Sequence, residues 1–138
     1  MVESIGVDLV EIDRIEQVAE RYGQRFLERV FTNREVRYCF ERGERYASLA
    51  VRFAAKEALF KALGLGWAAG LRWRDVEIVS DASKKPRFVL HGKAKQMVGD
   101  RQVLVSLSHT SDQAVAVVAL QSRRPRSTDA RRRRPHGA

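Results

Sequence analysis

Hydrophobic and polar residues alternate at the beginning of the chain, follow a helical period in its first half, and alternate again in its second half. Residues 2–10 alternate and include β-branched side chains, which predicts a strand. Apolar residues then recur at helical spacing from Asp13, a candidate N-cap, to residue 31, and Gly23 marks a candidate break in this helix. The longest and most apolar helix is predicted at residues 44–63. Because its apolar side chains lie on most sides, we expect it in the middle of the domain.

Thr32 and Glu35 form the sequence pattern of a capping box between these two helices, which predicts a short helix that ends near residue 42. Beyond residue 74 the hydrophobic period changes to two. We therefore expect a hairpin with a turn at residues 84–86, then a short helix and an antiparallel pair of strands. The predicted segments of this second half are 75–79, 87–91, 92–98, 103–109 and 114–120. Their order predicts an α+β fold with a mostly antiparallel sheet packed on a long central helix.

The composition indicates one folded domain followed by a basic extension. The chain has 138 residues, of which 44% are hydrophobic, and this suits a single compact domain at residues 1–121. Residues 122–138 contain seven arginines and one aspartate, so they supply +6 of the net charge of +9. This tail has almost no apolar residues, so we expect it to be disordered and to attract polyanions without specificity.

Two absences in the sequence indicate the compartment, and the single cysteine indicates the redox state. No apolar run approaches the roughly 20 residues of a membrane helix, and the first residues lack the basic region of a signal peptide. We therefore expect a cytoplasmic protein that does not enter a membrane. The single cysteine, Cys39, cannot form an internal disulfide and is predicted to be a buried, reduced thiol.

Three polar residues stand out from apolar surroundings. Asp8 interrupts an apolar strand, and because an unpaired buried carboxylate is costly, it must have a partner or lie at the rim. Glu57 precedes Lys61 by four residues on one helix, the favourable spacing for an ion pair. His109 ends a strand beside hydroxyl residues that can hydrogen-bond a phosphate. The simpler alternatives are a turn-capping aspartate, a solvated ion pair and a structural histidine.

A metal site arises if the end of the long helix meets the strand that carries Asp8. Asp8 and Glu57 would then converge, and two neighbouring carboxylates repel each other unless a cation lies between them. Mg²⁺ suits such a site because it binds one or two carboxylates, keeps water ligands and binds substrate phosphates. Arg52, Lys56 and Lys61 would balance further phosphate charge. The spacing of cysteine and histidine fits no zinc site, and no Walker loop is present.

Two segments together resemble the motifs of a known family. GVDLVEIDR (residues 6–14) is similar to its N-terminal motif, and RFAAKEALFKALG (residues 52–64) is similar to its second motif. The second motif alone would be weak evidence for the family. Both motifs in this order, in so short a chain, are specific evidence for it. With KP in the central hairpin and SLSH near the end, residues 2–120 resemble the holo-acyl-carrier-protein synthase branch of the 4′-phosphopantetheinyl transferases.

The resemblance implies transfer of phosphopantetheine from coenzyme A to a serine of an apo acyl carrier protein, with release of adenosine 3′,5′-bisphosphate. It implies that Asp8 and Glu57 hold Mg²⁺ and that Lys61 neutralises charge on the transferring phosphate. Arg52, Lys56 and His109 are then candidates for the other coenzyme phosphates, and Pro86 for the adenine side. A metal-bound water or one carboxylate could accept the serine proton, and the sequence leaves this choice open.

The resemblance also implies partners. We expect a homotrimer with sites between subunits, and both faces of the predicted last strand are apolar and need cover. We expect an acidic carrier protein of fatty acid biosynthesis to dock on Arg14, Arg21 and Arg25, spaced i, i+7 and i+11 on one helix face. A plain solvated face remains the alternative. Carrier domains of polyketide or peptide synthesis are alternative substrates, and the high net charge leaves nucleic-acid binding as a less favoured reading.

Overall fold

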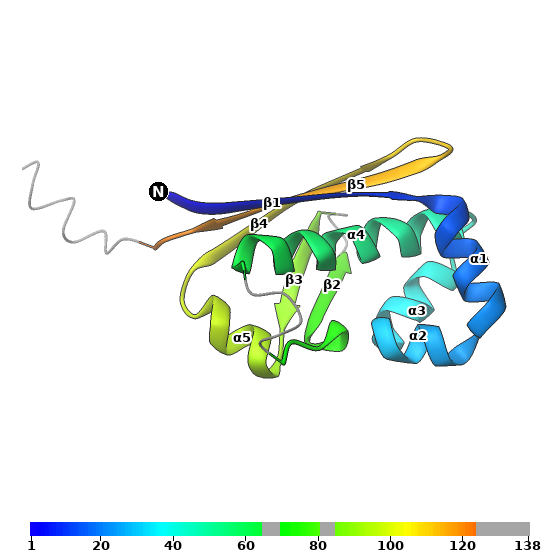
Figure 1. Ribbon diagram of the computed structural model, residues 1–138, viewed down its shortest axis with the longest axis horizontal. Helices are drawn as coiled ribbons and strands as arrows, with labels where there is room; N and C mark the ends of the chain where they lie inside the picture. Colours follow the sequence, from blue (N-terminus) through cyan, green and yellow to red (C-terminus); the bar gives the residue numbers. More distant parts are fainter. Residues whose placement is uncertain (65–69, 81–84, 124–138) are drawn as a thin grey trace, which may run out of the picture.

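The fold is built around one long helix, α4 (Arg45–Leu63), which lies between a sheet on one side and smaller elements on the other (Figure 1). The computed structural model describes residues 1–64, 70–80 and 85–123. Most of the side chains of α4 are buried, including those of Arg52 and Lys56. This confirms the predicted central helix, and its C-terminal cap is Gly64 with a left-handed φ of 77°.

A three-stranded antiparallel sheet covers one side of α4. Its strands are β1 (Val2–Glu11), β5 (Gln113–Gln121) and β4 (Gln102–His109), in the order β1-β5-β4. The even-numbered residues of β5 from 114 to 120 are fully buried against the helix. The opposite face of the same sheet is apolar but exposed, so the expectation that both faces of the last strand are apolar is confirmed. Its exposed apolar residues include Ile5, Val7, Leu9, Leu104 and Val117.

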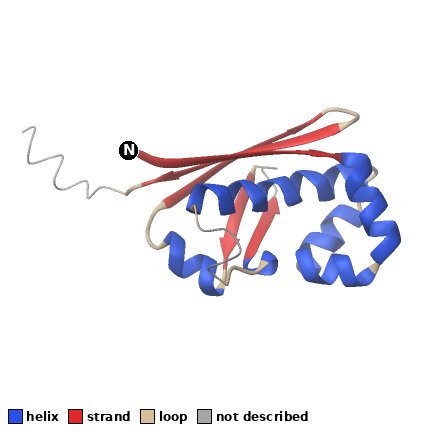
Figure 2. Cartoon of the chain, viewed as in Figure 1, coloured by secondary structure: helices blue, strands red, loops and turns tan. Residues whose placement is uncertain are grey.

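A separate two-stranded sheet lies on the other side of α4 (Figure 2). It consists of β2 (Val76–Ser80) and β3 (Pro86–Leu90), preceded by the short helix η2 (Trp73–Asp75) and followed by α5 (Gly92–Val98). The predicted hairpin is therefore confirmed, although part of its turn, residues 81–84, lies outside the described residues. The described strands are all antiparallel, and the predicted α+β fold is confirmed.

Three short helices gather at one end of α4 (Figure 1). The predicted first helix is divided into α1 (Ile12–Tyr22) and α2 (Gln24–Val30) by Gly23, whose φ is 57°. The prediction that Asp13 is the N-cap is wrong: Asp13 lies in the first turn, because the strand runs directly into the helix at Glu11. The capping box at α3 (Asn33–Phe40) is confirmed, since Thr32 and Glu35 exchange both expected hydrogen bonds.

Gly6 explains how closely β1 approaches α4. A Cβ atom at this position would overlap the carbonyl oxygen of Ala58 and would lie 2.8 Å from the amide nitrogen of Ala62. Only glycine opposite small helix residues therefore permits this packing. The first sequence motif thus contains a residue whose function is to bring the strand and the helix together.

The remaining predictions concern the ends of the domain and its environment. β5 ends at Gln121, and residues 124–138 of the Arg-rich tail lie outside the described residues, so the boundary and the predicted disorder stay predictions. Cys39 is free and fully buried, as predicted. No helix of the described segments has the length and apolarity needed to cross a membrane.

Candidate active site

The packing of β1 on α4 brings Asp8 and Glu57 into one pocket. Side chains of a strand alternate between faces, and Ser4, on the helix-facing side of β1, donates a 2.6 Å hydrogen bond from Oγ to the carbonyl of Ala62. Asp8 lies four residues further along the same face. Both carboxylates line a pocket of about 410 Å³ that also contains Arg14 of α1. The structure thus brings the strand aspartate and the helix glutamate to one pocket, as the resemblance to the family implied.

Lys61 pairs with Asp8 rather than with Glu57. Its Nζ donates hydrogen bonds of 3.1 Å to Asp8 Oδ1 and of 3.1 Å to the carbonyl of Val7. Within residues 1–64 no ion pair joins Glu57 to Lys61, so the simple helical ion pair suggested by the spacing is not the arrangement found. The Lys61 side chain is 55% exposed, which leaves its third N–H donor open to a ligand.

The electrostatics of the pocket favour a cation beside the carboxylates. Burial and then the negative charge of Asp8 raise the pKa of Glu57, and Lys61 only partly opposes this effect. In the described residues no group of three or more acidic, histidine or cysteine side chains surrounds a metal position. Two carboxylates alone fit Mg²⁺, which completes its shell with water and phosphate oxygens, better than they fit zinc.

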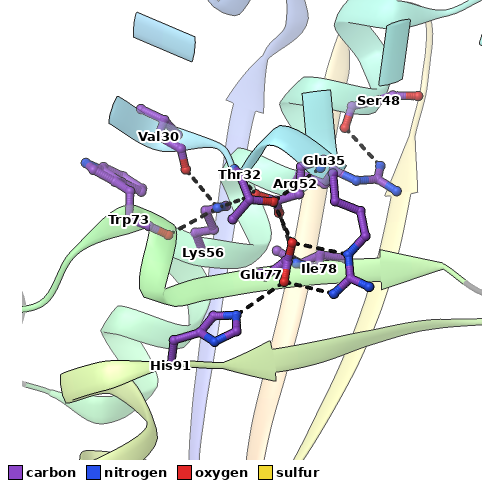
Figure 3. Close-up of polar contacts among 11 residues, drawn as sticks. Val30, Thr32, Glu35, Ser48, Arg52, Lys56, Trp73, Glu77, Ile78 and His91 are labelled. Carbon is purple, nitrogen blue, oxygen red and sulfur yellow. Dashed lines mark hydrogen bonds and ion pairs between the residues drawn. The ribbon is translucent and has the colours of Figure 1, made fainter. Parts of the chain in front are cut away.

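A second pocket, of about 430 Å³, collects three of the four residues expected to bind the rest of the coenzyme. Arg52 of α4, Pro86 at the start of β3 and His109 at the end of β4 all line it. Arg52 is 4% exposed. Its Nη1 donates to the carbonyl of Ser48 at 3.2 Å (Figure 3). Its Nη2 donates to Ser80 Oγ at 3.4 Å.

The charge of this second pocket is positive. Its described lining includes Arg42, Arg52 and Lys85 together with His109, and no acidic side chain lies among these lining residues. Nε of Arg52 is buried and has no hydrogen-bond partner among the described residues. A pocket with several cationic groups and no carboxylate suits an anionic ligand such as a phosphate ester.

Lys56, the fourth expected residue, does not reach either pocket. Its side chain is fully buried and its Nζ donates to Glu35 Oε1 at 2.7 Å, to the Val30 carbonyl at 2.7 Å and to the Trp73 carbonyl at 3.1 Å (Figure 3). Burial lowers the pKa of Lys56, and the charge of Glu35 opposes this. Three acceptors use its three donors, so the expected contact with a coenzyme phosphate is corrected to a structural role.

Glu35 and Glu77 extend this buried polar network. Glu35 Oε2 accepts a 2.9 Å hydrogen bond from the amide of Ile78, which ties α3 to β2. Glu77 accepts hydrogen bonds from Thr32 Oγ1 at 2.6 Å and Arg34 Nη2 at 3.0 Å, and His91 lies 3.2 Å away (Figure 3). Burial alone would raise the pKa of Glu77, but hydrogen bonds from Arg34, Thr32 and His91 outweigh it and lower the pKa to about 2.

The three arginines expected on one docking face are divided between two helices. Arg14 and Arg21 lie on α1, but the break at Gly23 places Arg25 on α2. The geometric premise of a single helix face is therefore wrong for Arg25. All three side chains are exposed, and Arg14 lines the carboxylate pocket.

The two pockets lie on different sides of α4 and share no lining residue. Arg52 and Glu57 are five residues apart, which turns the second side chain about 140° around the helix from the first. One chain thus presents the carboxylates and the positive pocket as two separate half-sites.

Sequence reasoning missed several residues of the positive pocket because they come from elements far apart in the chain. Tyr38, Arg42, Ser48 and Ser80 all line it. The four-residue spacing of Tyr38 and Arg42 was visible in the sequence and is typical of neighbours on a helix. Nothing local, however, indicated that they would face Arg52.

Comparison with known proteins agrees with this arrangement. The model of the 4′-phosphopantetheinyl transferase superfamily matches residues 4–118. The holo-[acyl-carrier-protein] synthase of Koribacter versatilis is 43% identical over 124 residues, which are 88% of this chain and 99% of that protein. The protein of the same name from Protochlamydia amoebophila is 46% identical over 116 residues, covering 84% of this chain and 95% of that protein.

Solved structures are similar over the same region. The holo-[acyl-carrier-protein] synthase of Neisseria meningitidis matches with a TM-score of 0.78 and 34% identity, covering 88% of this chain and all of that chain. The Helicobacter pylori enzyme, solved in complex with coenzyme A, matches with a TM-score of 0.75 and 32% identity over 85% of this chain and 99% of that one. Since the family motifs, the fold and relatives above 40% identity all agree over nearly the whole described domain, this chain belongs to the 4′-phosphopantetheinyl transferase superfamily.

Proposed function

We propose that this protein is a holo-[acyl-carrier-protein] synthase that transfers 4′-phosphopantetheine from coenzyme A to a serine of an apo acyl carrier protein in a Mg²⁺-dependent reaction. The serine hydroxyl gives its proton to one carboxylate or to a water, and its oxygen forms a bond to the β-phosphorus of the coenzyme. The bond from this phosphorus to the bridging oxygen breaks, and adenosine 3′,5′-bisphosphate leaves. The observation that carries this proposal is that Asp8 and Glu57 line one pocket and that Lys61 pairs with Asp8 at 3.1 Å.

The residues of the carboxylate pocket have separate tasks in this reaction. Asp8 and Glu57 would hold Mg²⁺, which when bound supplies charge neutralisation for the diphosphate. Lys61, already fixed by Asp8 and the Val7 carbonyl, directs its ammonium group toward the same region and would stabilise negative charge that develops on the transferring phosphate. Because positioning and charge stabilisation dominate phosphoryl-type transfer, this small set of groups is sufficient.

The adenosine end of coenzyme A would occupy the positive pocket. Arg52 and His109 would bind phosphate there, and Pro86 would line the adenine. The diphosphate would lie at the carboxylates of one subunit and the adenosine end in the positive pocket of another, because the two pockets of a single chain share no lining residue. A neighbouring subunit would supply the missing half-site.

A homotrimer provides such a neighbour. The outward face of the β1-β5-β4 sheet carries Ile5, Val7 and Leu9, which are 64%, 52% and 60% exposed. In the sheet Val7 lies opposite Val117, and Ile5 opposite Ala119, so these apolar residues are contiguous. A continuous apolar sheet face on a monomer favours burial against another subunit.

An acidic carrier protein would approach the carboxylate pocket over α1. Arg14 lines that pocket and Arg21 follows on the same helix, so both would attract an acidic partner toward the bound phosphopantetheine. Arg25 on α2 would extend the surface beyond the break at Gly23. The identity of the carrier, from fatty acid, polyketide or peptide synthesis, is decided by testing each apo carrier in turn.

The proposal is tested by intact-mass analysis of an apo carrier after incubation with the protein, coenzyme A and Mg²⁺. We expect the mass gain of one phosphopantetheine, lost when EDTA replaces Mg²⁺. Glu57→Gln should lower turnover by about 100-fold or more, the scale of removing a charge-stabilising group. The matched control is Asp100→Asn, an exposed carboxylate after α5. A fully active Glu57→Gln enzyme would refute the proposed site.

A further inference from the structure

Two arginines of the positive pocket contact one aromatic ring. The guanidinium carbon of Arg52 lies 4.4 Å from the centroid of the Tyr38 ring, and that of Arg42 lies 4.9 Å from the same centroid. Tyr38 lies on α3 and Arg42 follows four residues later, whereas Arg52 comes from α4. Both distances are within the range of cation–π attraction.

The two arginines are held differently. Arg52 is buried and is also fixed by hydrogen bonds to the Ser48 carbonyl and Ser80 Oγ. Arg42 is exposed, and within residues 1–64, 70–80 and 85–123 its side chain makes no hydrogen bond or ion pair, so the ring of Tyr38 is what orients it. Without this ring a long exposed side chain would sample many rotamers.

Two positive charges beside one ring repel each other unless an anion joins them. No carboxylate is among the described residues that line this pocket, so a bound anion would offset this repulsion. The diphosphate of coenzyme A belongs to the separate carboxylate pocket under the proposed function. The remaining charged group of that substrate is its 3′-phosphate, a phosphomonoester that carries up to two negative charges and offers three acceptor oxygens.

We propose that Tyr38 is a positioning residue that holds Arg42 beside Arg52 as a two-arginine receptor for the 3′-phosphate, and thereby determines selectivity for coenzyme A over 3′-dephospho-coenzyme A. This inference rests on the proposed function, because it assigns the adenosine end of the coenzyme to the positive pocket. Tyr38 itself donates nothing to the phosphate: its ring sets the orientation of Arg42 and covers the buried guanidinium of Arg52.

The test is the ratio of the KM for 3′-dephospho-coenzyme A to the KM for coenzyme A, measured in the transfer assay. Tyr38→Leu removes the ring, and we expect this ratio to fall about fivefold, within the range of a lost cation–π pair. Tyr38→Phe keeps the aromatic face and should retain most of the selectivity. Calorimetric binding of adenosine 3′,5′-bisphosphate should weaken by a similar factor in Tyr38→Leu and stay close to the wild-type value in Tyr38→Phe.

A second variant keeps the inference testable if Tyr38→Leu fails to fold. Arg42→Gln changes only an exposed side chain, and it should lower the same KM ratio by at least the same factor, because it removes the charged group that the ring positions. An unchanged ratio in Arg42→Gln, or in folded Tyr38→Leu, would overturn the inference while leaving the proposed function intact. A wild-type enzyme that transfers to the carrier but does not distinguish the two coenzymes would also overturn it, and one without transfer activity would refute the proposed function itself.

Discussion

Replacing Gly6 by alanine tests whether the active site depends on the contact between β1 and α4. The added Cβ would overlap the Ala58 carbonyl oxygen, and it would lie 2.8 Å from the amide nitrogen of Ala62, closer than the 3.0 Å below which real Cβ contacts are essentially never seen. Both neighbours are backbone atoms of a helix, so no side chain can rotate away. Relief requires the strand and the helix to move apart.

The expected destabilisation follows from this geometry. Overpacking a close contact typically costs about 1–3 kcal/mol, and the upper end applies here because only movement of a whole element relieves the overlap. We therefore expect Gly6→Ala to lower the free energy of unfolding by about 3 kcal/mol, equivalent to a Tm decrease on the order of 10 °C for a domain of this size.

The same displacement should impair catalysis. Asp8 follows Gly6 by two residues on the same face, so a shift of β1 moves its carboxylate away from Glu57 and stretches the 3.1 Å contact with Lys61. Since a misplacement of about 1 Å in a catalytic group can reduce turnover about 100-fold, we expect such a loss well below the Tm of the variant.

Thermal unfolding followed by circular dichroism and the carrier mass assay measure the two effects. Gly43→Ala is the matched control, because nothing lies within 4 Å of a Cβ at that position. This control should change the free energy of unfolding by about 0.5 kcal/mol or less. If Gly6→Ala has the stability and activity of Gly43→Ala, the close approach of β1 to α4 does not exist in solution, and the meeting of Asp8 and Glu57 loses its basis.

Four further predictions concern charge and assembly. Because the pKa of Glu57 is raised, its carboxylate should titrate in NMR above the ordinary value of 4.5, and Asp8→Asn should lower the midpoint of that titration. An unchanged midpoint in Asp8→Asn would show that the charge of Asp8 does not act on Glu57. Glu77→Gln should reduce stability most at neutral pH, because the folded-state pKa of about 2 lies below the ordinary 4.5. The deficit should shrink as pH falls from 4.5 toward 2 in urea titrations, and a deficit independent of pH would exclude the ion pair as its cause. Arg14→Glu should raise the KM for the carrier more than that for coenzyme A, and equal effects would remove Arg14 from the docking surface. Val117→Lys, on the exposed sheet face, should convert a trimer into monomers by light scattering, whereas Lys93→Glu on α5 should not; a trimeric Val117→Lys would assign the interface elsewhere.

Local patterns in the sequence predicted the elements well because each has a local cause. The capping box of Thr32 and Glu35, the break at Gly23 and the end of α4 at Gly64 depend on hydrogen bonds or φ values within a few residues. The meeting of Asp8 and Glu57 was predictable only through the family motifs. No periodicity indicates that a particular strand residue and a particular helix residue, about 50 positions apart, face each other.

The error at Lys56 has the opposite cause. Its place beside Glu57 in the motif suggested a shared task, and charge alone indicates neither burial nor partner. The partner is Glu35, a capping residue whose role seemed complete within its own helix, yet whose two oxygens also bind Lys56 and the Ile78 amide. A carboxylate has about four acceptor sites, so the cap left room for a second, long-range function that sequence reasoning did not consider.

Lys56 and Glu57 show why one helix serves as both core and catalytic scaffold. Consecutive helical residues differ by about 100° in direction, so a helix buried on most sides presents each neighbour to a different layer. Lys56 faces α3, η2 and the end of α2, where its hydrogen bonds fix the rotation of α4 about its axis. That fixed rotation is what presents Glu57 to β1 and Arg52 to the positive pocket. The charged pair in the motif is therefore explained by geometry: one residue anchors the helix so that the other can act.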